Sequence, residues 1–189
     1  MQKRGFAGDI SAWDRVQIAA IRSLLSNFSL SLIMSVGKAD VEDFELILHV
    51  INTSNSDAYR SIIPPEQFKD PVLTLKQLQK EFDKMTFYTY RVENKPVGVA
   101  ALRTDKGKTG IVRWVHVLPE HQHKGIGTSL MKHIEREAKK VGVKKLKVVY
   151  VWEKAYWAKN FYIRSCYKKG NSVTLPWGDR AQVYEKTLT

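Results

Sequence analysis

The sequence contains a single cysteine, Cys166, among its 189 residues. One cysteine excludes an internal disulfide, which favours a reducing compartment, and we therefore expect a cytoplasmic protein. No Cys/His spacing typical of a zinc ligand set is present, so we expect no metal. Because no histidine partner can be identified for Cys166, we expect a buried structural thiol rather than a nucleophile.

Long apolar runs are missing as well. No stretch approaches about eighteen uncharged apolar residues, so we expect no membrane span. Lys3 and Arg4 precede an apolar stretch, but Arg15 and Arg22 interrupt it, which favours a peripheral helix or extension over a targeting segment.

Acidic residues are few. The sequence has 31 Lys and Arg but only 19 Asp and Glu, which gives a formal net charge of +12. That balance favours anionic partners: a phosphorylated cofactor, nucleic acid or an acidic membrane surface.

The most informative stretch is a strand, a loop and a helix within residues 111–141. Residues 111–117 are rich in β-branched side chains, and the apolar spacing becomes helical from Leu130 onward. Gly125 and Gly127 stand where the strand turns into the helix. The first N–H groups of a helix lack intrahelical partners, and a residue without Cβ lets a ligand approach them closely. With side-chain donors from His123 and Lys124, this loop is predicted to bind phosphate.

The loop resembles the pyrophosphate loop of the GNAT superfamily of acyl-CoA-dependent N-acetyltransferases. It fits neither the P-loop nor the dinucleotide-binding fingerprint. The family pattern is Gln/Arg-x-x-Gly-x-Gly/Ala, which stands here as Gln122-His123-Lys124-Gly125-Ile126-Gly127. A downstream segment is similar to the family's A-x-x-F-Y-x-x-x-G-F segment and reads Ala158-Lys159-Asn160-Phe161-Tyr162, followed by Cys166-Tyr167. The resemblance covers roughly residues 34–188.

The resemblance implies acetyl-CoA as co-substrate and direct attack of a primary amine on the thioester. The strands at 111–117 and 145–151 would separate, so that the pantetheine arm pairs with backbone between them. The N–H of Val117 would polarise the thioester carbonyl, and Tyr162 occupies the position of the family's general acid. The cofactor-binding residues implied in this way are Val115, Val117, Gln122, His123, Lys124, Gly125, Ile126, Gly127, Thr128 and Asn160.

The sequence departs from the family pattern in three places. Ala155 stands where asparagine is usual, and Cys166 stands where glycine is usual. Ile111 and Arg113 occupy positions where the family often carries a catalytic glutamate or histidine. Regular strand alternation would place His116 on the opposite face from them, so we predict no dedicated base. Arg113 would be available to hold an acidic group of the acceptor.

The acceptor stays open between a protein N-terminus, a lysine, a polyamine and a small metabolite, and a homodimer is open as well. An alternative function is a non-catalytic acyl-CoA-binding or nucleic-acid-binding protein on the same fold. The aromatic residues within 152–162, beside many lysines, would provide stacking for single-stranded nucleic acid. We give this partner less weight, because the same residues suit packing against a sheet.

The element order predicts an α/β fold, in which helices flank a mixed, mostly antiparallel sheet in three layers. We expect an N-terminal extension at 1–33 with a helix from about 11 to 28, followed by an acetyltransferase domain at 34–189. Strands are predicted at about 30–36, 87–92, 97–103, 111–117, 145–151, 167–174 and 181–187. Helices are predicted at 40–51, ended by turn-forming residues 52–56, and at 75–85, 126–141 and 153–165. The strands at 111–117 and 145–151 should be parallel, because a helix joins them.

Overall fold

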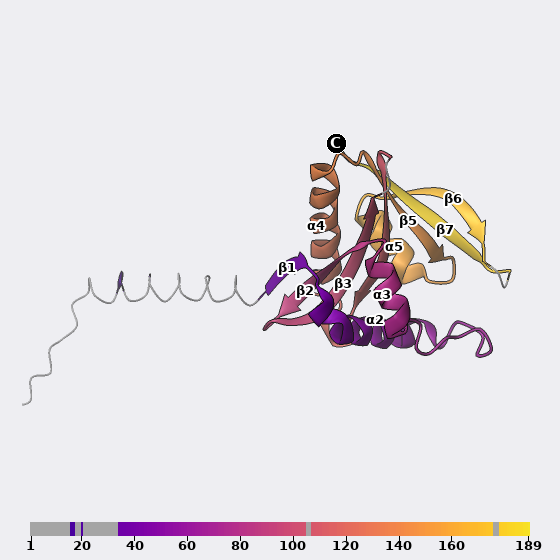
Figure 1. Ribbon diagram of the computed structural model, residues 1–189. Helices are drawn as coiled ribbons and strands as arrows, with labels where there is room; N and C mark the ends of the chain where they lie inside the picture. Colours follow the sequence, from indigo (N-terminus) through magenta and orange to yellow (C-terminus); the bar gives the residue numbers. More distant parts are fainter. Residues whose placement is uncertain (1–15, 18–19, 21–33, 105–106, 176–177) are drawn as a thin grey trace, which may run out of the picture.

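The computed structural model describes residues 16–17, 20, 34–104, 107–175 and 178–189 (Figure 1). Seven strands form one sheet in the order β1-β2-β3-β4-β5-β7-β6. The strands are β1 (Met34–Lys38), β2 (Thr86–Val92), β3 (Lys95–Thr104), β4 (Thr109–Val117), β5 (Lys145–Trp152), β6 (Lys168–Thr174) and β7 (Arg180–Thr187). The helices are α2 (Phe44–Tyr59), α3 (Leu75–Phe82), α4 (Ile126–Lys140) and α5 (Tyr156–Arg164), with 3₁₀ turns η1 (Val41–Asp43) and η2 (Pro119–His121).

Every neighbouring pair of strands is antiparallel except β4 and β5, which run parallel and are joined through α4. A parallel pair needs such a crossover, because its connection must return the chain to the starting end of the sheet. The predicted fold class is therefore confirmed: the protein has an α/β architecture with a mostly antiparallel sheet.

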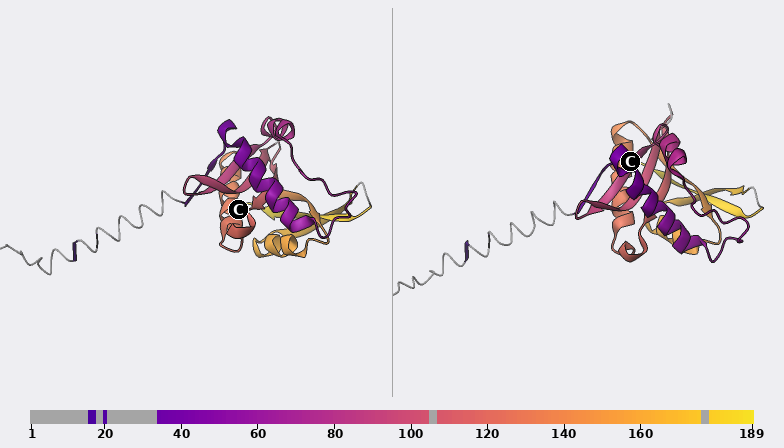
Figure 2. Two further views of the ribbon diagram at one scale, coloured as in Figure 1. Left: turned by 90° about the horizontal axis from the view of Figure 1, so that it is seen from below. Right: turned by 60° about the horizontal axis from the view of Figure 1, so that its bottom comes forward.

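The helices cover both faces of the sheet. A Cβ added at Gly98 of β3 would meet Ile126 and Leu130 of α4, so this face of β3 lies against α4. The next residue, Val99, faces the other way, towards α2, which crosses the sheet in both views of Figure 2. Leu130 and Ile134 on α4 and Ile47 and Ile51 on α2 are fully buried, so each helix contributes one apolar stripe to the core.

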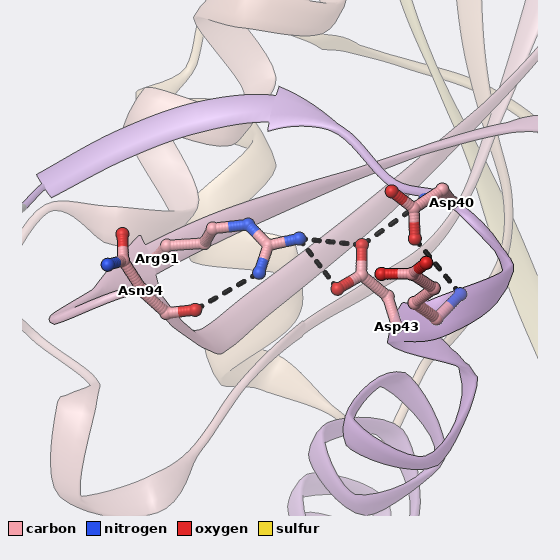
Figure 3. Close-up of polar contacts among 5 residues, drawn as sticks. Asp40, Asp43, Arg91 and Asn94 are labelled. Atoms are coloured by element: carbon pink, nitrogen blue, oxygen red, sulfur yellow. Dashed lines mark hydrogen bonds and ion pairs between the residues drawn. The ribbon is translucent and has the colours of Figure 1, made fainter.

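The start of α2 is fixed to the sheet by polar contacts (Figure 3). Asp40 and Asp43 form a capping box, in which each side chain accepts a hydrogen bond from the other end of the turn. Both carboxylate oxygens of Asp43 accept from Nη2 of Arg91 on β2, at 2.6 Å each. Asp43 is buried, so the ion pair also neutralises a charge that would be costly to leave alone. The direction in which α2 crosses the sheet is thereby set.

The other end of α2 lies further along the chain than the sequence predicted. The helix continues to Tyr59, so the expected stop in residues 52–56 was wrong. Asn52 points into the structure and exchanges two hydrogen bonds with the backbone of Leu73: Nδ2 donates at 2.9 Å and Oδ1 accepts at 3.0 Å. Ser54 is buried. These tertiary contacts outweigh the local turn preference of Asn and Ser, and they extend α2 by two turns.

The remaining boundaries differ from the predictions by a few residues. The first described strand begins at Met34, the helix that starts at Leu75 ends at Phe82, and the last helix begins at Tyr156. Such shifts are common, because helix and strand ends fray. Of the predicted helix at 11–28, only Val16, Gln17 and Ala20 are described, and the rest lies outside the described residues.

Candidate functional site

The centre of the sheet opens between β4 and β5. Their parallel pairing runs from Thr109–Lys145 to Val112–Val148 and goes no further, although both strands continue. Just beyond the last pair, each strand contains a residue with positive φ: Trp114 at 54° and Tyr150 at 61°. Both are non-glycine residues in a sparsely populated region of φ/ψ space. Each lies at a shift in the pairing register, Trp114 in the pairing of β4 with β3 and Tyr150 in the pairing of β5 with β7. The two bulges turn the strands apart.

A cavity of about 1170 Å³ occupies this opening. The cavity is lined by residues of β4, β5, α4 and the loop before it, the end of α2, α5 with the turn that contains Cys166, and Lys186 of β7. The predicted cofactor-binding residues that line it are Val115, Val117, Gln122, His123, Gly125, Ile126, Gly127, Thr128 and Asn160, and Tyr162 lines it too. Lys124 is not part of the lining. The structure thus brings together residues from both sequence motifs.

The loop before α4 is held by its own side chains. Nε2 of Gln122 donates to the Val117 carbonyl at 3.1 Å, and Nζ of Lys124 donates to the Glu120 carbonyl at 2.8 Å. Both side chains therefore shape the loop from within. Gly125 is the N-cap of α4 in the left-handed region, with φ of 79°, where glycine is favoured. No side chain of the described residues caps the start of α4, so its first N–H groups remain available to an anion.

The two glycines of the loop serve different purposes. Among the described residues, nothing lies within 4 Å of the place where a Cβ of Gly125 would stand, so the space beside it is open. A Cβ on Gly127 would lie 3.2 Å from the ring of Phe161 on α5. Gly127 thus lets α4 and α5 pack closely. The open space for a phosphate lies beside Gly125, which fits the pyrophosphate of an acyl-CoA.

The backbone of Val117 is directed into the opening. The N–H of the next residue, Leu118, donates to the Val97 carbonyl of β3 at 2.9 Å. Backbone groups of successive strand residues point to opposite sides, so the N–H and C=O of Val117 point away from β3. The Val117 carbonyl accepts from Gln122 on that side. The N–H of Val117 is therefore positioned to donate to a group lying between β4 and β5.

Tyr162 is buried in the wall of the cavity. Its ring lies 5.1 Å from that of Phe161 and 5.9 Å from that of Tyr184. Burial, and to a smaller extent the nearby Tyr59, raises the pKa of the Tyr162 hydroxyl well above its ordinary value. The hydroxyl therefore stays protonated and acts as a hydrogen-bond donor.

The end of α2 forms the wall of the cavity on the face of the sheet opposite α4. Ser54, Asp57 and Tyr59 line it, and the ring of Tyr59 lies 5.8 Å from that of Trp157 on α5. The contribution of Ser54 and Asp57 was not predicted from the sequence, because the predicted helix ended too early. One signal was available: no proline occurs between residue 44 and Pro64, so nothing in the covalent structure required the helix to stop.

His116 lies on the face that we predicted it would not occupy. His116 is opposite Val99, and Arg113 is opposite Ala101, so three steps on β4 match two steps on β3. The bulge at Trp114 adds one residue and reverses the alternation beyond it. His116 therefore shares the face of Arg113, towards α2, where its Nδ1 lies 3.4 Å from Oγ of Ser54. Burial lowers the pKa of His116 to about 4, so the imidazole is neutral at physiological pH.

Arg113 is engaged within the protein. Its Nη1 lies 3.2 Å from Oε2 of Glu81 on α3, and Nε1 of Trp114 donates to the same oxygen at 3.0 Å. The guanidinium also lies over the Trp114 ring, 5.1 Å from its centre. Since a carboxylate already neutralises this cation, an acidic group of an acceptor would have to displace Glu81. These contacts do not favour the predicted role of Arg113 in holding such a group.

Cys166 is exposed, so the prediction of a buried thiol was wrong. It follows the end of α5 with φ of 63°, a turn that carries the chain away from the helix and leaves the side chain outside the core.

The described residues contain no group of three or more His, Cys, Asp or Glu side chains that could hold a metal ion. Among the described helices, none is both long and apolar enough to cross a membrane.

One family model and several solved structures are similar to this chain. Residues 49–166 match the sequence model described as "Acetyltransferase (GNAT) family". An acetyltransferase of the GNAT family from Staphylococcus aureus Mu50 is similar in structure, with a TM-score of 0.66 at 14% identity, covering 82% of this chain and 99% of that one. No curated protein sequence matches.

Two further similar structures come from proteins with named activities. The PaiA N-acetyltransferase from Thermoplasma acidophilum, solved in complex with coenzyme A, has a TM-score of 0.64 at 20% identity, covering 82% of this chain and 98% of that one. The ribosomal-protein-S18-alanine N-acetyltransferase from Escherichia coli has a TM-score of 0.66 at 14% identity, covering 82% and 94%. At these identities the similarity concerns the fold.

Proposed function

Since the chain belongs to the GNAT family of acetyltransferases, we propose that it transfers the acetyl group of acetyl-CoA to a primary amine by direct attack. One observation carries the proposal: the gap between β4 and β5, the uncapped start of α4 and Tyr162 all border one cavity. The single cysteine of the chain fits a reducing cytoplasm, where we expect the protein to act.

Acetyl-CoA would supply the activated acetyl group as a thioester. The N–H groups at the start of α4, with the side chains of His123 and Thr128, would bind its pyrophosphate. The backbone of Val115 and Val117 would pair with the pantetheine arm between the strands, and the exposed Asn160 would contact it from α5. In this arrangement Gln122 and Lys124 hold the loop in shape.

The N–H of Val117 would stabilise the negative charge that develops on the acetyl oxygen during attack. Tyr162 would then donate to the departing sulfur. A thiol has a reference pKa of about 8.5, so the leaving thiolate is a modest base near neutral pH. A hydroxyl that stays protonated would donate a hydrogen bond to this thiolate and stabilise its charge as it leaves.

Calorimetric titration with coenzyme A, followed by a screen of amines with acetyl-CoA, tests the proposal. The screen should contain free amino acids, polyamines, lysine peptides and peptides with free N-termini, including N-terminal alanine because the similar S18 enzyme acts on alanine. Binding of coenzyme A together with acetylation of at least one class supports an enzyme. Binding without acetylation of any amine would favour the non-catalytic acyl-CoA-binding alternative. A homodimer stays a prediction.

A further inference from the structure

In acetyl transfer to an amine the departing sulfur needs a hydrogen-bond donor, which Tyr162 supplies in the proposed function. The amine must also lose a proton, so the acceptor side of the cavity needs a group that takes it. Glu81 is bound to Arg113 and Trp114, and Glu135 is bound by Nζ of Lys186 at 2.8 and 2.9 Å. These two carboxylates are therefore already engaged.

His116 lies beside the position at which the reaction would take place. It directly precedes Val117, whose N–H points into the gap, and consecutive Cα atoms are only about 3.8 Å apart. The bulge at Trp114 turns its side chain to the α2 face, where it lines the cavity. Nδ1 is near Oγ of Ser54, and no described residue hydrogen-bonds to Nε2. Nε2 is thus the ring nitrogen left to accept a proton.

We propose that the acceptor amine attacks as its neutral free base and that Nε2 of His116 accepts the proton released as the C–N bond forms. The inference rests on the proposed function. The nitrogen lone pair forms the bond to the acetyl carbon, and the C–S bond breaks with its electron pair going to sulfur. The Tyr162 hydroxyl donates a hydrogen bond to the departing thiolate, which takes its proton from solvent, and His116 passes its own proton to solvent. The products are the amide and the free thiol of coenzyme A.

The surroundings of His116 allow it to accept a proton, but they limit the groups from which it can take one. Ser54 contacts it from α2, and Asp57 on the same helix lines the same cavity, while Arg113 on its own strand is neutralised by Glu81 from α3. Burial keeps the imidazole uncharged, so it can accept a proton, yet it is far too weak a base to take one from a free ammonium ion. An amine that has attacked the carbonyl is much more acidic, and its proton is the one His116 can take.

This limit defines a class of acceptor. A peptide α-amino group, with a pKa of about 7.7–8.0, is neutral in about a tenth of molecules at pH 7, whereas a lysine side chain, with a pKa of about 10.4, is neutral in well under a thousandth. The site therefore favours weakly basic amines such as the α-amino group of a peptide or amino-acid derivative.

The first test compares the wild type with His116→Gln, which keeps similar size and a hydrogen-bonding group towards Ser54, and with His49→Gln as a control on α2 outside the cavity. We expect His116→Gln to lower kcat/KM about a hundredfold at pH 7 while calorimetry shows unchanged binding of coenzyme A. The deficit should shrink as pH rises towards 9.5, because hydroxide then removes the proton. A deficit that is the same at every pH would mark a structural role and overturn the proposal.

The second test uses two peptides of the same sequence, one with only its α-amino group free and one with only a lysine free. The rise of wild-type kcat/KM with pH should follow the pKa of each acceptor's own amine. If both acceptors gave the same pH profile, a titrating group of the enzyme would control the reaction and the proposal would fail. A wild type that binds coenzyme A but acetylates no amine in the screen would instead refute the proposed function itself.

A third measurement needs no activity. In ¹⁵N spectra of histidine-labelled protein, assigned with His116→Gln, the imidazole should be neutral at pH 7 with its proton on Nδ1, facing Ser54. A proton on Nε2 would leave that nitrogen unable to accept another and would overturn the assignment.

Discussion

Tyr162 lines the cavity, and its ring belongs to the buried aromatic cluster with Phe161 and Tyr184. Tyr162→Phe keeps the ring and removes the donor. Turnover should fall by about a hundred- to ten-thousandfold, because the departing sulfur loses its hydrogen-bond donor, while binding of coenzyme A should be unchanged. Steady-state kinetics and calorimetry would measure the two effects separately.

Two control variants belong with this change. Tyr184→Phe removes a hydroxyl next to the same ring but outside the cavity lining, and it should leave turnover within about twofold of the wild type. Cys166→Ala should do the same, because direct attack needs no acyl-cysteine. Full activity in Tyr162→Phe would remove this donor from the mechanism. A folded but inactive Cys166→Ala would point to a covalent intermediate instead.

His116 should also make stability depend on pH. Its pKa is about 4 in the folded protein, against a reference value of about 6.5, so below pH 6.5 the unfolded chain takes up a proton that the folded chain refuses. Stability is therefore highest above pH 6.5 and falls as pH drops towards 4. Urea unfolding at pH 7 and 4.5 should show His116→Gln losing less free energy than the wild type, by on the order of 1–3 kcal/mol. Equal losses would show that His116 titrates normally.

Individual residues were predictable from sequence where a motif named them, and unpredictable where a bulge decided their direction. Tyr162 and the loop residues lie together as the two motifs implied. His116 faces the opposite way from the prediction because regular alternation was assumed through Trp114. Tryptophan gives no warning of a positive φ, which is usually signalled by Gly, Asn or Asp.

In the proposed function, the first turn of α4 would bind the pyrophosphate of acetyl-CoA. Thr128 is exposed there and lines the cavity, so a glutamate at this position would place a negative charge among the N–H groups. The helix itself tolerates an acid in its first turn, because the charge complements the macrodipole. Thr128→Glu should therefore keep or slightly raise the melting temperature while binding of coenzyme A falls below detection in calorimetry.

The matched control is Gln79→Glu, which makes the same change of charge at an exposed position of α3, outside the cavity lining. It should bind coenzyme A as the wild type does. If Thr128→Glu bound it equally well, the start of α4 would not be the phosphate site. This design is sharper than a change at Gly127, where any side chain would first press on Phe161.

Helices and strands were predictable wherever the apolar period was regular. α4 shows this best, since its buried residues Leu130, Ile134 and Ala138 recur at helical spacing. The end of α2 was not predictable in this way, because the contact that extends it joins Asn52 to Leu73 across the intervening loop. A long-range contact of this kind leaves no local signal, and it decides which residues reach the acceptor side of the cavity.

The order of strands and helices was enough to predict the sheet, its single parallel pair and the three layers. These follow from connection lengths and handedness, which depend little on individual side chains. The opening between β4 and β5 was implied only by the family resemblance. The opening arises from one residue with positive φ on each strand, and only the backbone conformation reveals this.

Among the described residues the sheet begins at Met34, and the residues from there onward form a buried core with one another. β1 pairs with β2 along its whole length, from Met34–Val92 to Lys38–Tyr88, and the buried apolar core runs from Ala39 to Leu188. A shortened chain that begins at Leu30 should therefore fold, with a melting temperature within a few degrees of the full chain's, and bind coenzyme A with the same affinity in calorimetry. Because the described residues that line the cavity run from Ser54 to Lys186, turnover with a small acceptor should also be preserved. Aggregation of the shortened chain, or loss of coenzyme A binding, would show that residues 1–33 belong to the acetyltransferase domain, and lost turnover with a peptide acceptor alone would assign them to acceptor binding.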